Sequence, residues 1–469
     1  MRSTNFSEAA IESNQARCGL LALLALLLAS TPTWSQTLPA IPAADRLQPY
    51  EWPAARQVER SSLSRAGLRR LEGQHVTIVT DLPSSPAVDE LPDVIDQAVP
   101  QLARYFGVEP AKVEPWRVLA MVMREPARFA SAGLMPEGEP EFPDGLSRGY
   151  ELWIHEQSSD FYRRHLLIHE VTHSFMATHL GGCGPGWYME ATAELLGTHT
   201  WDPQRRNLEL GVMPPSRQAA PMWGRITLVR NAVANRQALP ISSVMQIDNG
   251  RALPTTSYAW CWALAKFLDT HPRYQQRFRS LPQRVLDRRF DDSLRQLYRE
   301  DWSDLDTEWR VFVSSLEYGH DIPREAIDFR PAKPGSRNGR VSIEADRGWQ
   351  SSGWYVEEGK SYEIRAGGRF VVGAEADGTP WTAEPGGITL EYFAGRPLGQ
   401  LLAAVDDRSD EGGDPGRAGT SGLLRSVAIG ARGRLTPSRS GTVYLRVNDS
   451  PASLDNNRGS LTAAIRQVP

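Results

Sequence analysis

The sequence predicts an α+β protein in which a small mixed sheet and a mainly helical half are followed by an antiparallel β-sandwich. Three observations lead to this prediction. Short apolar, β-branched runs in the first third of the chain are typical of buried strands. Residues 160–317 have almost entirely helical periodicity. Beyond a Pro- and Gly-rich linker, alternating runs such as SYEIRA, GITLEYF and TVYLRV are separated by Gly, Asp, Asn and Pro, as in a small sandwich.

The predicted elements begin with a strand at 75–80, because HVTIVT alternates and is β-branched. A helix is predicted over 88–105, where one apolar stripe is made of Val94, Ile95, Val99, Leu102 and Phe106. WRVLAMVM at 116–123 is predicted as a buried strand and GYELWI at 149–154 as a shorter one. The helical stretch that follows is broken at 181–186 and at Pro214, Pro215, Pro240, Pro254 and Pro272.

The length of 469 residues exceeds one ordinary domain, so two are expected. We place them at 74–330 and 342–469, with a linker at 331–341. A content of 41% hydrophobic and 23% charged residues is that of a soluble protein with a sizeable core. The net charge of -4 provides no basic face, so nucleic acid is not an expected partner.

The N-terminus resembles an export signal. An unbroken apolar run, CGLLALLALLLA, is too short to span a membrane as a helix and has the length of a signal-peptide core. We therefore predict a signal peptide at 1–35, a secreted or periplasmic protein, and no stable membrane span after cleavage. The alternative is a membrane anchor. Residues 36–73 form an N-terminal extension, and whether it is a propeptide stays open.

The motif HEVTH, from His169 to His173, points to a metal site. On a helix, residues four apart lie on the same face, so both imidazoles can reach one ion, and Glu170 is rotated toward the position of a general base. A third ligand is expected from GWYMEATAELLG, where Glu190 would bind the metal and Glu194, one turn on, would orient a ligand histidine. The alternative is a surface helix with incidental histidines.

HEVTH followed by WYMEATAE is similar to the gluzincin superfamily, in particular to secreted bacterial proteins called peptidase-MA-like. The resemblance covers residues 75–317. It implies a zincin-like catalytic domain, a zinc metallopeptidase with a protein or peptide substrate, and an edge strand at GYELWI that holds the substrate. Ala191 stands where these proteins usually have glycine. No signature for a free α-amine is recognisable, so endo- and exopeptidase activity both stay open.

Other residues have two interpretations each. By the same resemblance, Tyr258 would donate a hydrogen bond to the oxyanion, or it packs as a core aromatic. His165 and His179 continue the histidine series, and we expect them to be structural. Cys183 and Cys261 would form a disulfide in an oxidising compartment, or remain two separate thiols.

The C-terminal segment YLRVNDSPASLDNNRGSLTAAI concentrates oxygen donors that suit calcium, although turns are rich in these residue types anyway. Together with GGRF and PGGI, it is similar to the bacterial calcium-dependent galactophilic lectin. The resemblance implies a calcium ion bound by the side chains of Asp449, Asn456 and Asn457 and the carbonyls of Ser453 and Val372. The histidine and glutamine that contact the sugar in that lectin are missing near 384–387. Calcium is therefore expected more than carbohydrate.

Two functions of different class remain. The first is a secreted zinc peptidase whose C-terminal domain binds calcium and, by extension, glycan. The second is a catalytically silent surface or glycan-binding protein that retains a zinc fold. The intact Glu170 favours the first, because a scaffold does not need a general base. The substrate, cleavage preference and oligomeric state do not follow from the sequence.

Overall fold

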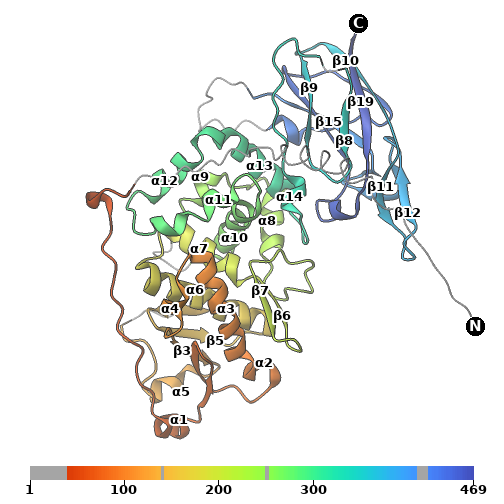
Figure 1. Cartoon of the computed structure of the whole chain (residues 1–469). Coiled ribbons are helices and arrows are strands. Elements are labelled where there is room, and N and C mark those ends of the chain that lie inside the picture. The colour runs from red at the N-terminus through yellow and green to blue at the C-terminus, as the bar shows by residue number, and fades with distance from the viewer. Residues whose placement is uncertain (1–39, 139–141, 249–252, 338, 409–420) are drawn as a thin grey trace, which may run out of the picture. The chain divides into compact units, whose positions relative to one another are not determined.

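The computed structural model describes residues 40–469 except 139–141, 249–252, 338 and 409–420, and it has the predicted α+β fold. Residues Ile41–Pro469 form one compact unit. Figure 1 shows helices surrounding the strands of the first part of the chain, and strands alone through most of its blue C-terminal part. The predicted signal peptide at 1–35 lies outside the described residues.

The N-terminal sheet has five strands in the order β1-β2-β3-β5-β4. Strands β2, β3 and β5 run parallel, and β1 and β4 pair antiparallel at the two edges. The central strands are apolar on both faces because helices cover both. The bounds are Arg69–Glu72 (β1), Val76–Thr80 (β2), Val118–Met123 (β3), Gly145–Arg148 (β4) and Glu151–His155 (β5).

The interpretation of GYELWI as the edge strand is wrong. Its strand, β5, lies between β3 and β4, and β4 is the edge. Leu152, Trp153 and Ile154 are all buried, and such a run needs a neighbour on each side to satisfy its backbone groups. The short, half-exposed GLSR of β4 tolerates an edge position better.

Helices cover the two faces of this sheet. α3 (Leu91–Phe106), which confirms the predicted apolar helix, and α6 (Asp160–Phe175) pack on one face. α1 (Arg60–Ala66) and α5 (Pro126–Ser131) pack on the other, where Leu63 and Phe129 share a core with Trp153. The domain boundary at 74 stays a prediction, but the sheet already begins at Arg69.

The helical half follows β5. α7 (Gly186–Gly197) packs against α6 on one side and α10 (Thr255–Thr270) on the other, so the centre of this half is made of three adjacent helices. The other elements are α2 (Pro86–Asp89), α4 (Pro110–Val113), β6 (His199–Asp202), β7 (Asn207–Leu210), α8 (Arg225–Ala234), α9 (Ile241–Val244), α11 (Gln275–Phe278), α12 (Phe290–Leu297), α13 (Trp302–Ser315) and α14 (Ile322–Glu325).

The C-terminal part is an antiparallel β-sandwich. Its two four-stranded sheets have the orders β17-β10-β19-β8 and β16-β15-β18-β9, and their inner faces share one apolar core. The strands are β8 (Val341–Glu344), β9 (Gln350–Val356), β10 (Ser361–Gly367), β11 (Phe370–Ala374), β12 (Pro380–Ala383), β13 (Ile388–Phe393), β14 (Arg396–Leu398), β15 (Leu401–Asp406), β16 (Val427–Ala428), β17 (Arg432–Leu435), β18 (Gly441–Val447) and β19 (Ser460–Val468).

The sandwich contacts the end of the helical half within the same compact unit. Val311 and Tyr444 belong to one small apolar cluster, and Arg446 of β18 forms a buried ion pair of 2.7 Å with Glu325 of α14. The predicted linker boundaries at 331 and 341 are not tested by these contacts. Among the described residues, none of the helices combines the length and the apolar character needed to cross a membrane.

Candidate metal centre

The two histidines of HEVTH lie on one face of α6, as their spacing predicts. Their Nε2 atoms are 2.9 Å apart, and the residues are 5% (His169) and 7% (His173) exposed. Helix α6 is fixed at its start by Ser159, whose Oγ accepts a hydrogen bond of 3.1 Å from the backbone N–H of Tyr162. Both rings therefore approach one point from a single rigid element.

Glu190 of α7 completes this group. Its Oε2 lies 3.2 Å from Nε2 of His169 and 3.5 Å from Nε2 of His173. The three ligand atoms lie within 4.8 Å of one another, close enough to share one ion. Oε2 of Glu190 is buried without a hydrogen-bond partner among the described residues. Two imidazoles and a carboxylate with an unsatisfied oxygen fit a divalent cation.

The connection GGCGPG brings α7 back against α6. Gly181 and Gly184 have φ angles of 76° and 75°, in the left-handed region that glycine adopts without strain. Pro185 then precedes the first turn of α7. A Cβ at Gly184 would lie 3.1 Å from the ring of Tyr188, so a larger residue would also crowd the start of the helix.

The electrostatics of the centre favour positive charge. Burial would raise the pKa of Glu190, but His173 and His169 outweigh burial and lower it to about 2. Burial would lower the pKa of His169, but the neighbouring carboxylates of Glu190 and Glu194 raise it to about 10. The carboxylates thus stabilise a cation at the position where the imidazoles meet.

A second layer of side chains supports the ligands. Oε1 of Glu194 lies 3.5 Å from Nδ1 of His169, on the side of the ring away from Glu190. Arg225 of α8 donates two hydrogen bonds to Glu194, of 3.0 and 2.9 Å. Burial opposes ionisation of Glu194, but Arg225 and His165 hold its pKa well below the usual value. Glu194 is placed as predicted, whereas Arg225 was not found from the sequence.

Glu170 is buried beside the ligands and faces the edge strand β4. Burial raises the pKa of its carboxyl, and the charges of His173 and His169 oppose this only in part. Ser147 of β4 forms a hydrogen bond with it. A Cβ at Gly145 would lie only 2.5 Å from Oε1, so glycine allows β4 to approach the carboxylate closely.

Tyr258 of α10 lies next to the centre. Its ring is 6.3 Å from that of His169, and the guanidinium of Arg225 stacks over it at 5.7 Å. Burial and then the charges of Glu190 and Glu194 raise its pKa, which keeps the phenol protonated at neutral pH. Tyr258 therefore lies near the centre as a hydrogen-bond donor. Whether the phenol contacts a substrate stays a prediction.

Of the other candidates near the centre, His165 groups with His169 and Glu194, whose ligand atoms all lie within 4.8 Å of one another. His165 is buried on α6 with Nε2 3.5 Å from Glu194, and His179 packs against Phe175 beyond the end of this helix. The disulfide considered between Cys183 and Cys261 is not present, because both cysteines are free. Cys183 instead donates from Sγ to the carbonyl of His173 at 3.7 Å, and Cys261 is buried in α10.

The calcium candidates are brought together in part. Asp449 and Asn457 are buried, and Nδ2 of Asn457 donates to Oδ2 of Asp449 at 2.9 Å. Oδ1 of Asn457 is buried without a hydrogen-bond partner among the described residues. Asn456 is exposed and Ser453 half-buried in the same loop. Of these four residues, Asp449 and Asn457 alone form a buried pair with oxygen ligand atoms.

Comparisons with known proteins leave the family open. No protein-family model matches the sequence, and no curated protein matches it. Among solved structures, the chain is weakly similar to one described as "EclA N-terminal domain; PllA-like lectin", with 18% identity over 28% of this chain and 98% of that chain and a TM-score of 0.20. The resemblance to the gluzincin superfamily therefore rests on the sequence motifs alone.

Proposed function

We propose that this protein is a secreted or periplasmic zinc-dependent peptidase, with His169, His173 and Glu190 as the metal ligands and Glu170 as the general base. The observation that carries the proposal is the convergence of three buried ligand atoms within 4.8 Å of one another, beside the buried carboxylate of Glu170. Two imidazoles and one carboxylate are a donor set that zinc prefers in catalytic sites with an open position. A zinc ion held there would act as a Lewis acid and lower the pKa of a bound water to about 7.

The residues around the ligands supply what hydrolysis of an amide requires. Among the described residues no Arg or Lys forms an ion pair with Glu170, and its raised pKa suits a group that accepts and returns a proton. The close approach of Gly145 places the carboxylate directly against β4. The protonated phenol of Tyr258 is available to donate to the oxyanion that forms on the attacked carbonyl.

The substrate class follows from the edge strand. The described residues leave the outer edge of β4 unpaired, and this strand contains both Gly145 and Ser147. An extended peptide that pairs with β4 would pass directly beside the carboxylate of Glu170. A peptide backbone is the ligand that such an edge recognises, since its N–H and C=O groups continue the ladder.

For the sandwich we propose a calcium ion at Asp449 and Asn457. The support is the buried carboxylate of Asp449 together with the unsatisfied Oδ1 of Asn457, both hard oxygen donors. The carbonyls of Ser453 and Val372 and the side chain of Asn456 would complete the coordination. Carbohydrate binding by this part of the chain stays a prediction.

Cleavage of casein and of a fluorogenic peptide library by the purified protein tests the peptidase proposal. We expect cleavage that 1,10-phenanthroline abolishes and that stoichiometric zinc restores, because the ligands are neutral donors and one carboxylate with high zinc affinity. A serine-protease inhibitor is the control and should have no effect. A zinc-loaded protein that cleaves none of these substrates would favour the alternative, a scaffold that retains the zinc fold.

A further inference from the structure

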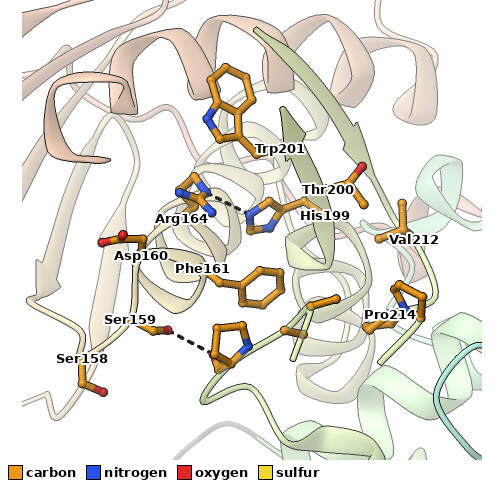
Figure 2. A pocket seen from close by; sticks show the side chains of 14 residues that line it. Ser158, Ser159, Asp160, Phe161, Arg164, His199, Thr200, Trp201, Val212 and Pro214 are labelled. Carbon is orange, nitrogen blue, oxygen red and sulfur yellow. Dashed lines mark hydrogen bonds between the residues drawn. The ribbon is translucent and has the colours of Figure 1, made fainter. Parts of the chain in front are cut away.

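A cavity of about 580 Å³ lies outside the metal centre. It is formed where α6 begins, by the strand that follows α7 and by the loop after β7 (Figure 2). This size falls within the range of about 300–1,000 Å³ that is usual for small-molecule sites. The cavity is lined by Ser158, Ser159, Asp160, Phe161, Arg164, His199, Thr200, Trp201, Val212, Pro214, Pro215, Ala219, Ala220 and Pro221.

The cavity is separate from the proposed substrate cleft. None of its lining residues is a proposed metal ligand or the general base. With about 100° of rotation per residue, Phe161 lies on the opposite side of α6 from Glu170, and Arg164 lies roughly 120° away from it. An occupant of this cavity would therefore not compete directly with a peptide paired to β4.

One guanidinium in the cavity has unused hydrogen-bonding capacity. Arg164 is largely buried, and it donates from Nη1 to Glu90 at 2.8 Å and from Nε to His199 at 3.3 Å. Its Nη2 makes no hydrogen bond to the described residues. Burial lowers the pKa of Arg164 and Glu90 offsets this in part. A second acceptor at Nη2 would thus be favourable.

The surroundings of Arg164 add a second donor. Nε1 of Trp201 is buried and also lacks a partner among the described residues. His199 is already used, since its Nδ1 is 2.8 Å from the carbonyl of Gly197. In Figure 2 the carboxylate of Asp160 points away from His199, and it is paired with Arg163 at 2.7 Å. Arg164 and Trp201 therefore each offer a donor that has no partner among the described residues.

The remaining walls are apolar. Phe161, which lines the cavity, stacks on His199 with ring centroids 4.5 Å apart (Figure 2). Val212 and Ala220 continue this surface. Burying an aromatic or aliphatic group against such walls is favourable, whereas a hydrophilic group would find no hydrogen-bond partner there.

We propose that this cavity is a binding site for a small organic carboxylate, with the carboxylate on Nη2 of Arg164 and the apolar body against Phe161 and Pro214. The ligand would contact α6, to which Arg164 belongs, and the strand β6, which begins at His199 two residues after the end of α7. Helices α6 and α7 approach each other closely at this end, because a Cβ at Gly197 of α7 would lie 2.8 Å from the ring of His165 of α6.

The probes are N-acetyl-L-phenylalanine and 3-phenylpropionate, each compared with its uncharged amide, in titrations of the full-length protein by calorimetry and saturation-transfer NMR. Both acids are expected to bind about tenfold more tightly than their amides, because only the carboxylate forms a charge-assisted hydrogen bond with the guanidinium. Equal affinity of acid and amide, or no binding by either acid, would overturn the proposal.

Two variants locate the site. Arg164→Gln removes the donor. Ala219→Trp places a large side chain in the cavity from an exposed position, so this second variant keeps the test valid if Arg164→Gln fails to fold. Either variant should weaken binding of the acids at least tenfold. Arg205→Gln, an arginine 85% exposed in the β6–β7 hairpin, is the matched control and should bind normally. Acid binding that survives Ala219→Trp would place the carboxylate elsewhere, for example on the metal centre, and would refute the site.

Discussion

Replacing Glu170 by Gln is expected to lower kcat for peptide hydrolysis by about 10²- to 10⁴-fold, the usual contribution of a general base. The amide keeps the shape of the side chain, so the close approach of Gly145 and the hydrogen bond to Ser147 are retained. It cannot accept a proton at neutral pH. The loss should therefore fall on kcat, with KM nearly unchanged.

The zinc content of this variant should equal that of the wild type, because Glu170 is not among the three converging ligand atoms. Its thermal stability should be equal or higher, since a buried carboxylate without a cationic partner costs desolvation energy that an amide does not. Glu125→Gln, on an exposed side chain, is the matched control and should have normal activity. A Glu170→Gln protein with wild-type kcat would remove the base from the mechanism.

Arg225→Met is expected to cost about 3–5 kcal/mol of unfolding free energy, the usual effect of removing one partner of a buried ion pair. The side chains of Arg225 and Glu194 are 4% and 2% exposed, so the substitution leaves an unpaired carboxylate without water. Chemical denaturation of the metal-free protein measures this directly, without the contribution of bound zinc. Arg230→Met, on an exposed residue of the same helix, should change stability by less than about 0.5 kcal/mol.

The same variant should bind zinc about 10- to 100-fold more weakly, because Glu194 would no longer be held in place to orient His169. The double variant Arg225→Met/Glu194→Gln separates the two effects. It should regain much of the stability, since no buried charge is left unpaired, but not the zinc affinity. If Arg225→Met alone were as stable as the wild type and bound zinc equally well, Arg225 would have no supporting role.

The metal-binding group was predictable because local geometry determines most of it. His169 and His173 share a face because they are four residues apart on one helix. Glu190 follows a glycine-rich turn that brings the next helix back against the first. Arg225 was not predictable. It lies 31 residues beyond Glu194, it is one of 52 Lys and Arg residues, and no spacing rule connects the two.

The fold class was predictable from periodicity, and the order of strands was not. The uninterrupted apolar run Leu152, Trp153 and Ile154 could have indicated an inner strand. The sequence GLSR, however, gives almost no strand signal of its own, so the edge strand was not predicted. Whether the two cysteines form a disulfide also depends on packing between distant segments. Cys183 donates a hydrogen bond to the carbonyl of His173 and is not bonded to Cys261. The cavity at Arg164 is built from segments that only the fold brings together.

The central claim is that two helices present two imidazoles and one carboxylate to a single ion. X-ray diffraction data collected from crystals of the zinc-loaded protein at energies on either side of the zinc absorption edge test it most directly. We expect one strong anomalous peak per chain at this centre, about 2.0–2.2 Å from Nε2 of His169, Nε2 of His173 and a carboxylate oxygen of Glu190. A zinc ion bound elsewhere, or ligand side chains that point apart with no peak between them, would contradict the account.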